Sequence, residues 1–301
     1  MTSDTPQIPE PLLESAPLAH RWASTSCTLD PSTGTSCAWY HGVWQYLRAM
    51  GLAPTLGEQG PFLLEKLRPL ARAGGHERVL VSACADYSLP AHVIDAYRGE
   101  GADLALAVVD RCETPLRLTR WYAERQRWPV ATQRHDILSY RSAAPFDVIV
   151  ANSVLGYFEP GTRPALFAAW SRLLRPGGTI ILTNRFRRGS RPGLVGFSPS
   201  QVEDFVAVTR QEAERWQRQL GFDPRQVAVW ARTYAERFQS HPILSVEEVE
   251  RGLRAAGFTL DHLEVIAVPG RPGGPVSGPS IAAAAEQLRV IATRRAGLAG
   301  A

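Results

Sequence analysis

The sequence has few cysteines, a single lysine and no long apolar run, and each shortage removes a class of protein. The four cysteines, at positions 27, 37, 84 and 112, include no pair with CxxC spacing, so we expect no metal site and no disulfide framework. No apolar stretch is long enough to span a membrane. The N-terminus lacks the basic start and apolar segment of a secretory signal. We therefore expect a cytoplasmic protein that has no membrane partner.

Basic residues outnumber acidic ones, but their distribution does not predict nucleic-acid binding. The formal net charge is +4 and the isoelectric point is about 9.0, yet Lys66 is the only lysine and the arginines are scattered. A local cluster occurs at residues 185–191, where an exposed, solvated loop is the simpler interpretation. We therefore expect no nucleic-acid partner.

The hydrophobic pattern predicts an α/β fold. Short apolar runs alternate with helix-length amphipathic segments, which is typical of a parallel sheet covered by helices on both faces. The strands are expected at residues 78–83, 104–109, 130–132, 146–151, 179–183, 262–268 and 287–293. No helix of normal length fits between the last two strands, so we expect them to pair antiparallel. The predicted fold is thus Rossmann-like, a seven-stranded and mostly parallel sheet with an antiparallel last strand.

The remaining segments predict additions to this core. We expect a mobile tail at residues 1–20 and a helical N-terminal segment at 21–75 that covers the site. The cofactor-binding core is expected in two pieces, 76–185 and 246–301, and the segment 186–245 between them is expected to form a helical lid. An insertion after the carboxyl end of a core strand lies above the ligand crevice of such a fold.

One acidic residue gives the first indication of a ligand. Asp110 ends the apolar run 104–109, which follows the run 78–83 after a helix-length segment. A carboxylate at the tip of the second strand of a βαβ unit is placed to accept hydrogen bonds from a ribose diol. The alternative is a solvated aspartate at a strand end.

Several segments in order resemble the class I S-adenosylmethionine-dependent methyltransferases over residues 76–294. The strongest match is 174–179, Leu-Arg-Pro-Gly-Gly-Thr, which resembles the turn before that family's fifth strand. The loop after the first strand departs from the family, because Ala83 and Ala85 stand where glycines are usual. Glycine serves there since the backbone approaches the ligand and adopts positive φ. Alanine permits close approach but adopts positive φ at a cost.

The resemblance implies S-adenosyl-L-methionine as cofactor and a set of residues that bind it. Asp110 would accept from the ribose hydroxyls, Arg111 would lie along the adenine, and Asp136 with the Ile137 N–H would bind the adenine edge. The methionine end would meet the loop after the first strand and the exit of the fourth. The residues implied there are Ala83, Ala85, Asp86, Asn152 and Ser153. Asp86 has an equally good alternative as the N-cap of the following helix.

Histidine and tyrosine in an aromatic N-terminal segment are the catalytic candidates. His41 has the pKa range of a general base at neutral pH, and Tyr40 beside it would orient the acceptor. The alternative for His41 is a structural or surface histidine.

These features predict a methyltransferase that acts on a nitrogen or oxygen nucleophile of a small, specialised-metabolite-like molecule. A homo-oligomer is compatible with the sequence. One alternative is a nucleic-acid methyltransferase. The other is a non-methylating S-adenosylmethionine-binding protein, which the altered glycine loop would favour.

Overall fold

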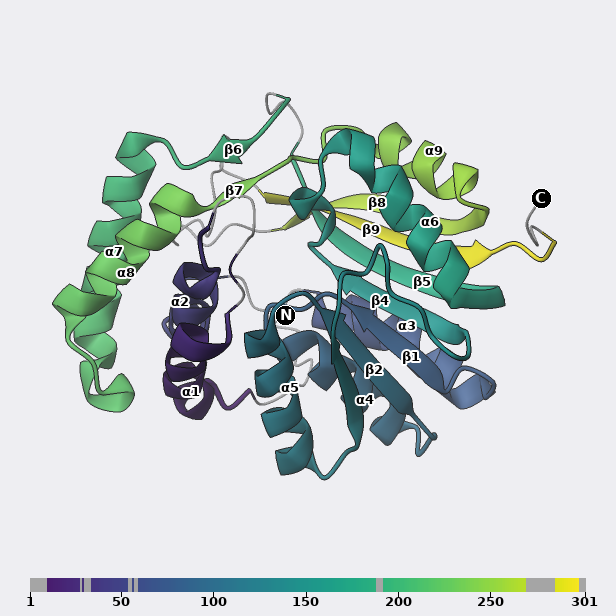
Figure 1. Ribbon diagram of the computed structural model, residues 1–301, viewed down its shortest axis with the longest axis horizontal. Helices are drawn as coiled ribbons and strands as arrows, with labels where there is room; N and C mark the ends of the chain where they lie inside the picture. The colour runs from purple at the N-terminus through teal and green to yellow at the C-terminus, as the bar shows by residue number, and fades with distance from the viewer. Residues whose placement is uncertain are drawn as a thin grey trace, which may run out of the picture.

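The computed structural model describes residues 10–27, 29, 34–53, 56, 59–187, 192–268 and 285–297. A seven-stranded sheet with the order β3-β2-β1-β4-β5-β9-β8 forms the centre of the fold (Figure 1). The strands are β1 (Arg78–Ser82), β2 (Ala105–Asp110), β3 (Val130–Arg134), β4 (Phe146–Asn152), β5 (Leu174–Phe186), β8 (Phe258–Val268) and β9 (Ala285–Arg294). The pairs among β1 to β5 are parallel, whereas β9 runs antiparallel to both of its neighbours. The predicted fold class is therefore confirmed.

Helices cover both faces of this sheet, as the continuous apolar runs of its central strands require. Alternate side chains of each strand point to opposite faces. Val79 and Val81 of β1 pack among α3, α4 and α5, whereas Leu80 packs toward α6 and α9. The bounds of these helices are α3 (Gly60–Ala73), α4 (Ser88–Gly99), α5 (Glu113–Gln126), α6 (Arg163–Leu173) and α9 (Val246–Ala255).

Four further helices form a cap beside the sheet, which we call the helical cap (Figure 1). They are α1 (Leu12–Ser26), α2 (Ala38–Ala49), α7 (Pro199–Leu220) and α8 (Pro224–Arg237), and apolar residues of all four share one buried cluster. The short elements η2 (Leu155–Tyr157), η3 (Pro160–Thr162), β6 (Val195–Gly196) and β7 (Gln239–Ser240) complete the fold. No helix of the described ranges has the length and apolarity needed to cross a membrane.

Helix α1 corrects the expectation of a mobile tail over residues 1–20. That prediction is wrong from Leu12 onward, while residues 1–9 lie outside the described part of the chain. The side chains that α1 buries are small ones, Ser15, Ala16, Ala19 and Ala23. Small side chains let the helix approach its neighbours closely but give little hydrophobic signal, and Pro17 inside the helix further weakens the helical pattern.

A buried arginine at the start of α6 holds the C-terminal end of the inserted segment in place. Arg163 is 1% exposed and donates hydrogen bonds to the carbonyl oxygens of Leu155, His241 and Pro242. It also forms an ion pair with Glu248 of α9. The end of the insertion is thereby fixed to η2 and α9.

A second buried arginine fastens the helical cap to the core. Arg48 of α2 is 3% exposed and donates from Nη1 to Asp86 Oδ2 over 2.9 Å and from Nη2 to Ser88 Oγ over 3.2 Å. Its Nη2 also pairs with Glu10. Burial alone would lower the pKa of Arg48, but the charges of Asp86 and Glu10 raise it above its ordinary value. Trp44 donates to the same Asp86 oxygen over 3.0 Å. Helix α2 is thus tied to the loop that follows β1.

The loop after β1 keeps a glycine-like backbone without glycine. Ala83 has a φ of 66° and donates its N–H to Val109 O over 2.9 Å. An L-residue in this left-handed region carries a strain of roughly 1–2 kcal/mol. The shape of the loop is therefore preserved by its surroundings at the expense of local strain.

We expect Arg48→Leu to lower the free energy of unfolding by about 3–5 kcal/mol, because it leaves the buried Asp86 carboxylate and the partly buried Glu10 without their counter-charge. Arg232→Leu, which removes the exposed ion pair with Glu203, is the matched control and should barely change stability. Urea unfolding of both variants measures the difference. Equal losses in the two would contradict a fastening role for Arg48.

We expect Ala83→Gly to raise the free energy of unfolding by up to about 1 kcal/mol, since relief of strain exceeds the entropic cost of glycine. Ala85→Gly is the control, because Ala85 is not among the positive-φ residues and should only lose stability. Thermal unfolding of both variants tests this. The strain argument fails if Ala83→Gly is no more stable than Ala85→Gly.

Candidate cofactor and acceptor site

The carboxyl ends of β1, β2 and β3 are joined by hydrogen bonds that gather the predicted cofactor residues at one edge of the sheet. The Cys84 N–H, just beyond β1, donates to Asp110 Oδ2 over 3.0 Å. The His135 N–H, just beyond β3, donates to Asp110 O over 2.9 Å. Asp110 therefore lies at the centre of this edge. In open parallel sheets, ligands bind outside the carboxyl ends of the strands.

The Asp110 carboxylate is held by backbone donors on both oxygens. Besides the Cys84 contact, Oδ1 accepts the Cys112 N–H over 2.7 Å. Burial raises the pKa of Asp110 to about 6, although the two N–H groups oppose that shift. A carboxylate has about four acceptor positions, so two of them remain for an incoming diol. The geometry is compatible with the ribose-binding role predicted for Asp110.

The residues predicted for the adenine lie next to Asp110. Asp136 forms an exposed ion pair with Arg111 over 3.8 Å, and its Oδ1 accepts the Leu138 N–H over 2.9 Å. Ile137 is buried in the core cluster on the α6 side of the sheet. These contacts fix the loop after β3, while the binding roles of Arg111, Asp136 and Ile137 stay predictions.

The exit of β4 has a second strained residue. Ser153 has a φ of 53° and donates its N–H to Thr183 O over 2.8 Å. The Asn152 side chain accepts from the Thr183 hydroxyl over 2.7 Å. Strained backbone conformations of this kind occur preferentially at ligand sites. The structure thus brings Asn152 and Ser153 to the same edge as Asp110.

Asp86 is engaged in structural contacts. Its Oδ1 accepts the Ser88 N–H at the start of α4 over 2.7 Å, and its Oδ2 binds Arg48 and Trp44. The first of these contacts satisfies the first N–H of α4, although the N-cap residue is Tyr87 and not Asp86. Direct contact of Asp86 or Ala85 with a cofactor remains a prediction.

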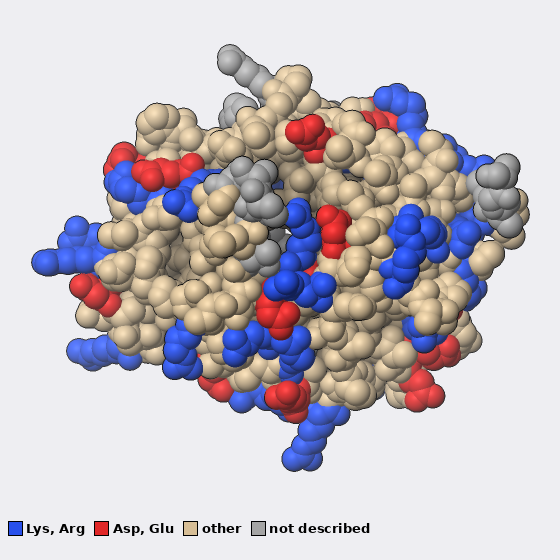
Figure 2. Space-filling model, viewed as in Figure 1, with Lys and Arg blue, Asp and Glu red and all other residues tan. Residues whose placement is uncertain are grey.

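Aromatic side chains of the helical cap and of η2 lie close to this edge. Tyr40 of α2 stacks on Trp44, with ring centroids 5.2 Å apart, and on Tyr234 of α8, with centroids 5.9 Å apart. Tyr157 of η2 is 60% exposed, and desolvation by its neighbours raises its pKa. Burial likewise raises the pKa of Tyr40 and of Tyr234. The face shown in Figure 2 is hollowed near its centre.

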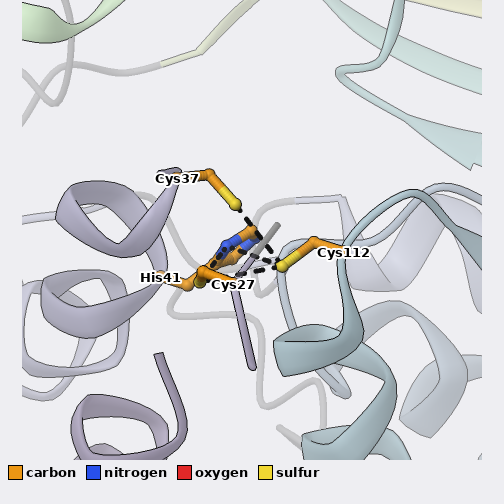
Figure 3. A group of neighbouring side chains, drawn as sticks. All are labelled: Cys27, Cys37, His41 and Cys112. Carbon is orange, nitrogen blue, oxygen red and sulfur yellow. Dashed lines mark hydrogen bonds between the residues drawn. The ribbon is translucent and has the colours of Figure 1, made fainter. Parts of the chain in front are cut away.

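The surroundings of His41 are the feature that the sequence analysis missed. Its Nδ1 lies 3.4 Å from Cys112 Sγ and 3.5 Å from Cys27 Sγ, and Cys37 belongs to the same group (Figure 3). Hydrogen bonds with Cys27 and Cys37 lower the pKa of Cys112. The general-base role of His41 stays a prediction, and it would require Nε2, because Nδ1 faces the sulfurs. The one local signal was the spacing Cys37-x-x-x-His41, which places two ligands one helical turn apart.

One comparison with known protein families gives a match, and it includes the strands that carry the predicted cofactor residues. Residues 90–178 match the family model described as a methyltransferase domain. No curated protein sequence matches the chain.

Solved methyltransferase structures show limited likeness. The S-adenosylmethionine-dependent methyltransferase SibL is 18% identical, with a TM-score of 0.47, and the match covers 92% of this chain and 62% of SibL. Magnesium protoporphyrin IX methyltransferase from Synechocystis PCC 6803 is 10% identical, with a TM-score of 0.49 and coverage of 83% and 92%. The N-methyltransferase NodS from Bradyrhizobium japonicum WM9 is 17% identical, with a TM-score of 0.46 and coverage of 84% and 98%.

The family match includes β2, β3 and β4, whose carboxyl ends carry Asp110, the loop with Asp136, and Asn152. In the sheet, β9 lies between β5 and β8, and its antiparallel pairing with β8 is the one that the sequence predicted. The family match thus covers a methyltransferase domain in the middle of the chain, and the whole sheet has the Rossmann-like form that the sequence predicted.

Proposed function

We propose that this protein transfers a methyl group to a nitrogen or oxygen atom of a small molecule bound between the helical cap and the carboxyl edge of the sheet. The observation that carries the proposal is the aromatic wall of Tyr40, Trp44 and Tyr157 beside the edge that holds Asp110, with Tyr40 stacked on the buried ring of Tyr234. Aromatic walls with a few polar groups are typical of sites for small organic ligands.

The residues at the sheet edge fit the cofactor. Asp110 would hold the ribose hydroxyls, and Asp136 and the Ile137 N–H would bind the adenine, along which Arg111 would lie. Asn152, Ser153 and the loop from Ala83 to Asp86 would bound the methionine end. The positive φ of Ala83 supports this role, because the loop keeps the backbone shape that glycine usually supplies. The altered loop therefore gives little support to the alternative of a non-methylating S-adenosylmethionine-binding protein, which rested on its missing glycines.

The cofactor supplies an electrophilic methyl group, so the chain's own task is to orient the acceptor and exclude water. Tyr40 is positioned for this by stacking on both of its aromatic neighbours. A hydroxyl or amine acceptor loses a proton during transfer, and the exposed Tyr157 side chain would hydrogen-bond it.

A nucleic-acid acceptor is the second candidate, and it would require a continuous basic surface around the crevice. On the face shown in Figure 2, basic side chains are interspersed with acidic ones. This distribution favours the small acceptor.

We expect Asp110→Ala to weaken binding of S-adenosylmethionine at least about tenfold, or about 1.4 kcal/mol, through loss of charged hydrogen bonds to the ribose. Asp147→Asn is the control. Asp147 lies at the opposite end of β4, where it accepts from Arg78 and Arg175, so affinity should not change. Calorimetry measures both dissociation constants. Unchanged affinity in Asp110→Ala would remove the ribose assignment.

We expect S-adenosylhomocysteine to slow hydrogen exchange in residues 36–50 and in the insertion at 186–245, as well as at the sheet edge. The reason is that α2 and α8 pack on each other and α2 contacts the loop after β1. Mass spectrometry with and without the ligand provides the measurement. Protection confined to residues 79–152 would argue against a cap that closes over the site.

A further inference from the structure

Four metal-binding side chains from three separate segments converge at the base of the helical cap (Figure 3). Cys27 directly follows α1, Cys37 precedes α2, His41 lies in the first turn of α2, and Cys112 precedes α5. Their ligand atoms all lie within 4.8 Å of one another. We propose that these residues bind one zinc ion, which fastens the helical cap to the cofactor-binding core.

The distances fit a tetrahedral site. With Zn–S near 2.3 Å and Zn–N near 2.0–2.1 Å, a regular tetrahedron separates two sulfurs by about 3.8 Å and a sulfur from a nitrogen by about 3.6 Å. The sulfurs of Cys37 and Cys112 are 3.5 Å apart, and those of Cys27 and Cys112 are 3.7 Å apart. The His41 Nδ1 is 3.4–3.5 Å from two of the sulfurs. Each of these edges is within a few tenths of an ångström of the value for zinc.

The donor set favours zinc over other divalent metals. Three thiolates and one imidazole are a ligand combination of structural zinc sites, whereas calcium and magnesium prefer oxygen. All four cysteines of the chain are free of disulfides. Four protein ligands fill the coordination sphere, which indicates a structural role.

A further contact supports the site from outside. The Thr114 side chain, fully buried at the start of α5, lies 3.2 Å from Cys27 Sγ. Hydroxyl contacts of this kind orient a ligand sulfur and are typical of the groups that surround metal ligands.

The proposed zinc site lies next to Asp110, so metal binding is expected to affect the cofactor-binding edge of the sheet. The backbone N–H of Cys112 donates to Asp110 Oδ1, so the zinc ligand and the predicted ribose ligand are joined by one hydrogen bond. Loss of zinc should therefore loosen α1 and α2 and disturb the Asp110 edge together.

Metal analysis of the purified, reduced full-length chain tests the proposal without reference to methyl transfer. We expect about one zinc ion per chain, the stoichiometry of a site with four protein ligands. Cys27→Ser and Cys112→Ser should lose the metal, whereas Cys84→Ser, which changes the one cysteine outside the cluster, should retain it. His41→Ala should also lose the metal. His41→Cys should keep it, because a fourth thiolate replaces the imidazole.

Cobalt substitution of the unaltered chain covers the case in which a variant does not fold. We expect cobalt added to the metal-free protein to give the intense visible bands of a tetrahedral ion and the thiolate-to-metal absorption in the near ultraviolet. Zinc should then displace it. The proposal is overturned if the reduced wild-type chain binds neither metal, or if Cys27→Ser and Cys112→Ser keep the full metal content.

Discussion

The arrangement of the helical cap and the core depends on the contacts of the buried Asp86 carboxylate with helix α2. It lies just beyond β1 and accepts hydrogen bonds from Trp44 and Arg48 of α2 and from the first N–H of α4. A buried charge of either sign is costly without its partner, so Arg48 and Asp86 each require the other in place. Because Tyr40 and His41 lie on the same helix as Arg48, this pair also sets where the aromatic wall and the cysteine cluster stand.

The cap is joined to the core at two neighbouring loops, and both loops carry predicted cofactor residues. The ion pair of Arg48 meets the loop after β1, and the cluster of Cys27, Cys37 and His41 meets Cys112 in the loop after β2. Both loops also donate a backbone N–H to Asp110, from Cys84 and Cys112. The aromatic wall and the sheet edge with Asp110 are therefore mechanically coupled, which would suit the proposed alignment of a methyl donor and an acceptor.

Strained backbone marks the same edge of the sheet. Ala83 and Ser153 are two of the three non-glycine residues with positive φ in the described chain, and they follow the adjacent strands β1 and β4. Their N–H groups are bonded to Val109 and Thr183 of the neighbouring strands. The sheet thus fixes two sharp turns where a ligand would approach the backbone, and the retained shape at Ala83 compensates for the missing glycine.

The sequence by itself determined the sheet and the position of Asp110, because both follow from local patterns. Apolar runs of strand length alternate with helical periodicity, and the acidic residue ends one of those runs. Patterns local in the sequence were therefore enough to predict the strands, the antiparallel pairing of the last two and the candidate ribose ligand. Helix α1 was not predicted, because the side chains on its buried face are small and give a weak hydrophobic pattern. They stabilise the helix only by allowing close packing against a neighbouring helix. The cysteine cluster was decided by the tertiary structure alone. Its members lie as far apart as Cys27 and Cys112, and only the packing of α1 and α2 against the loop after β2 brings their sulfurs to one point.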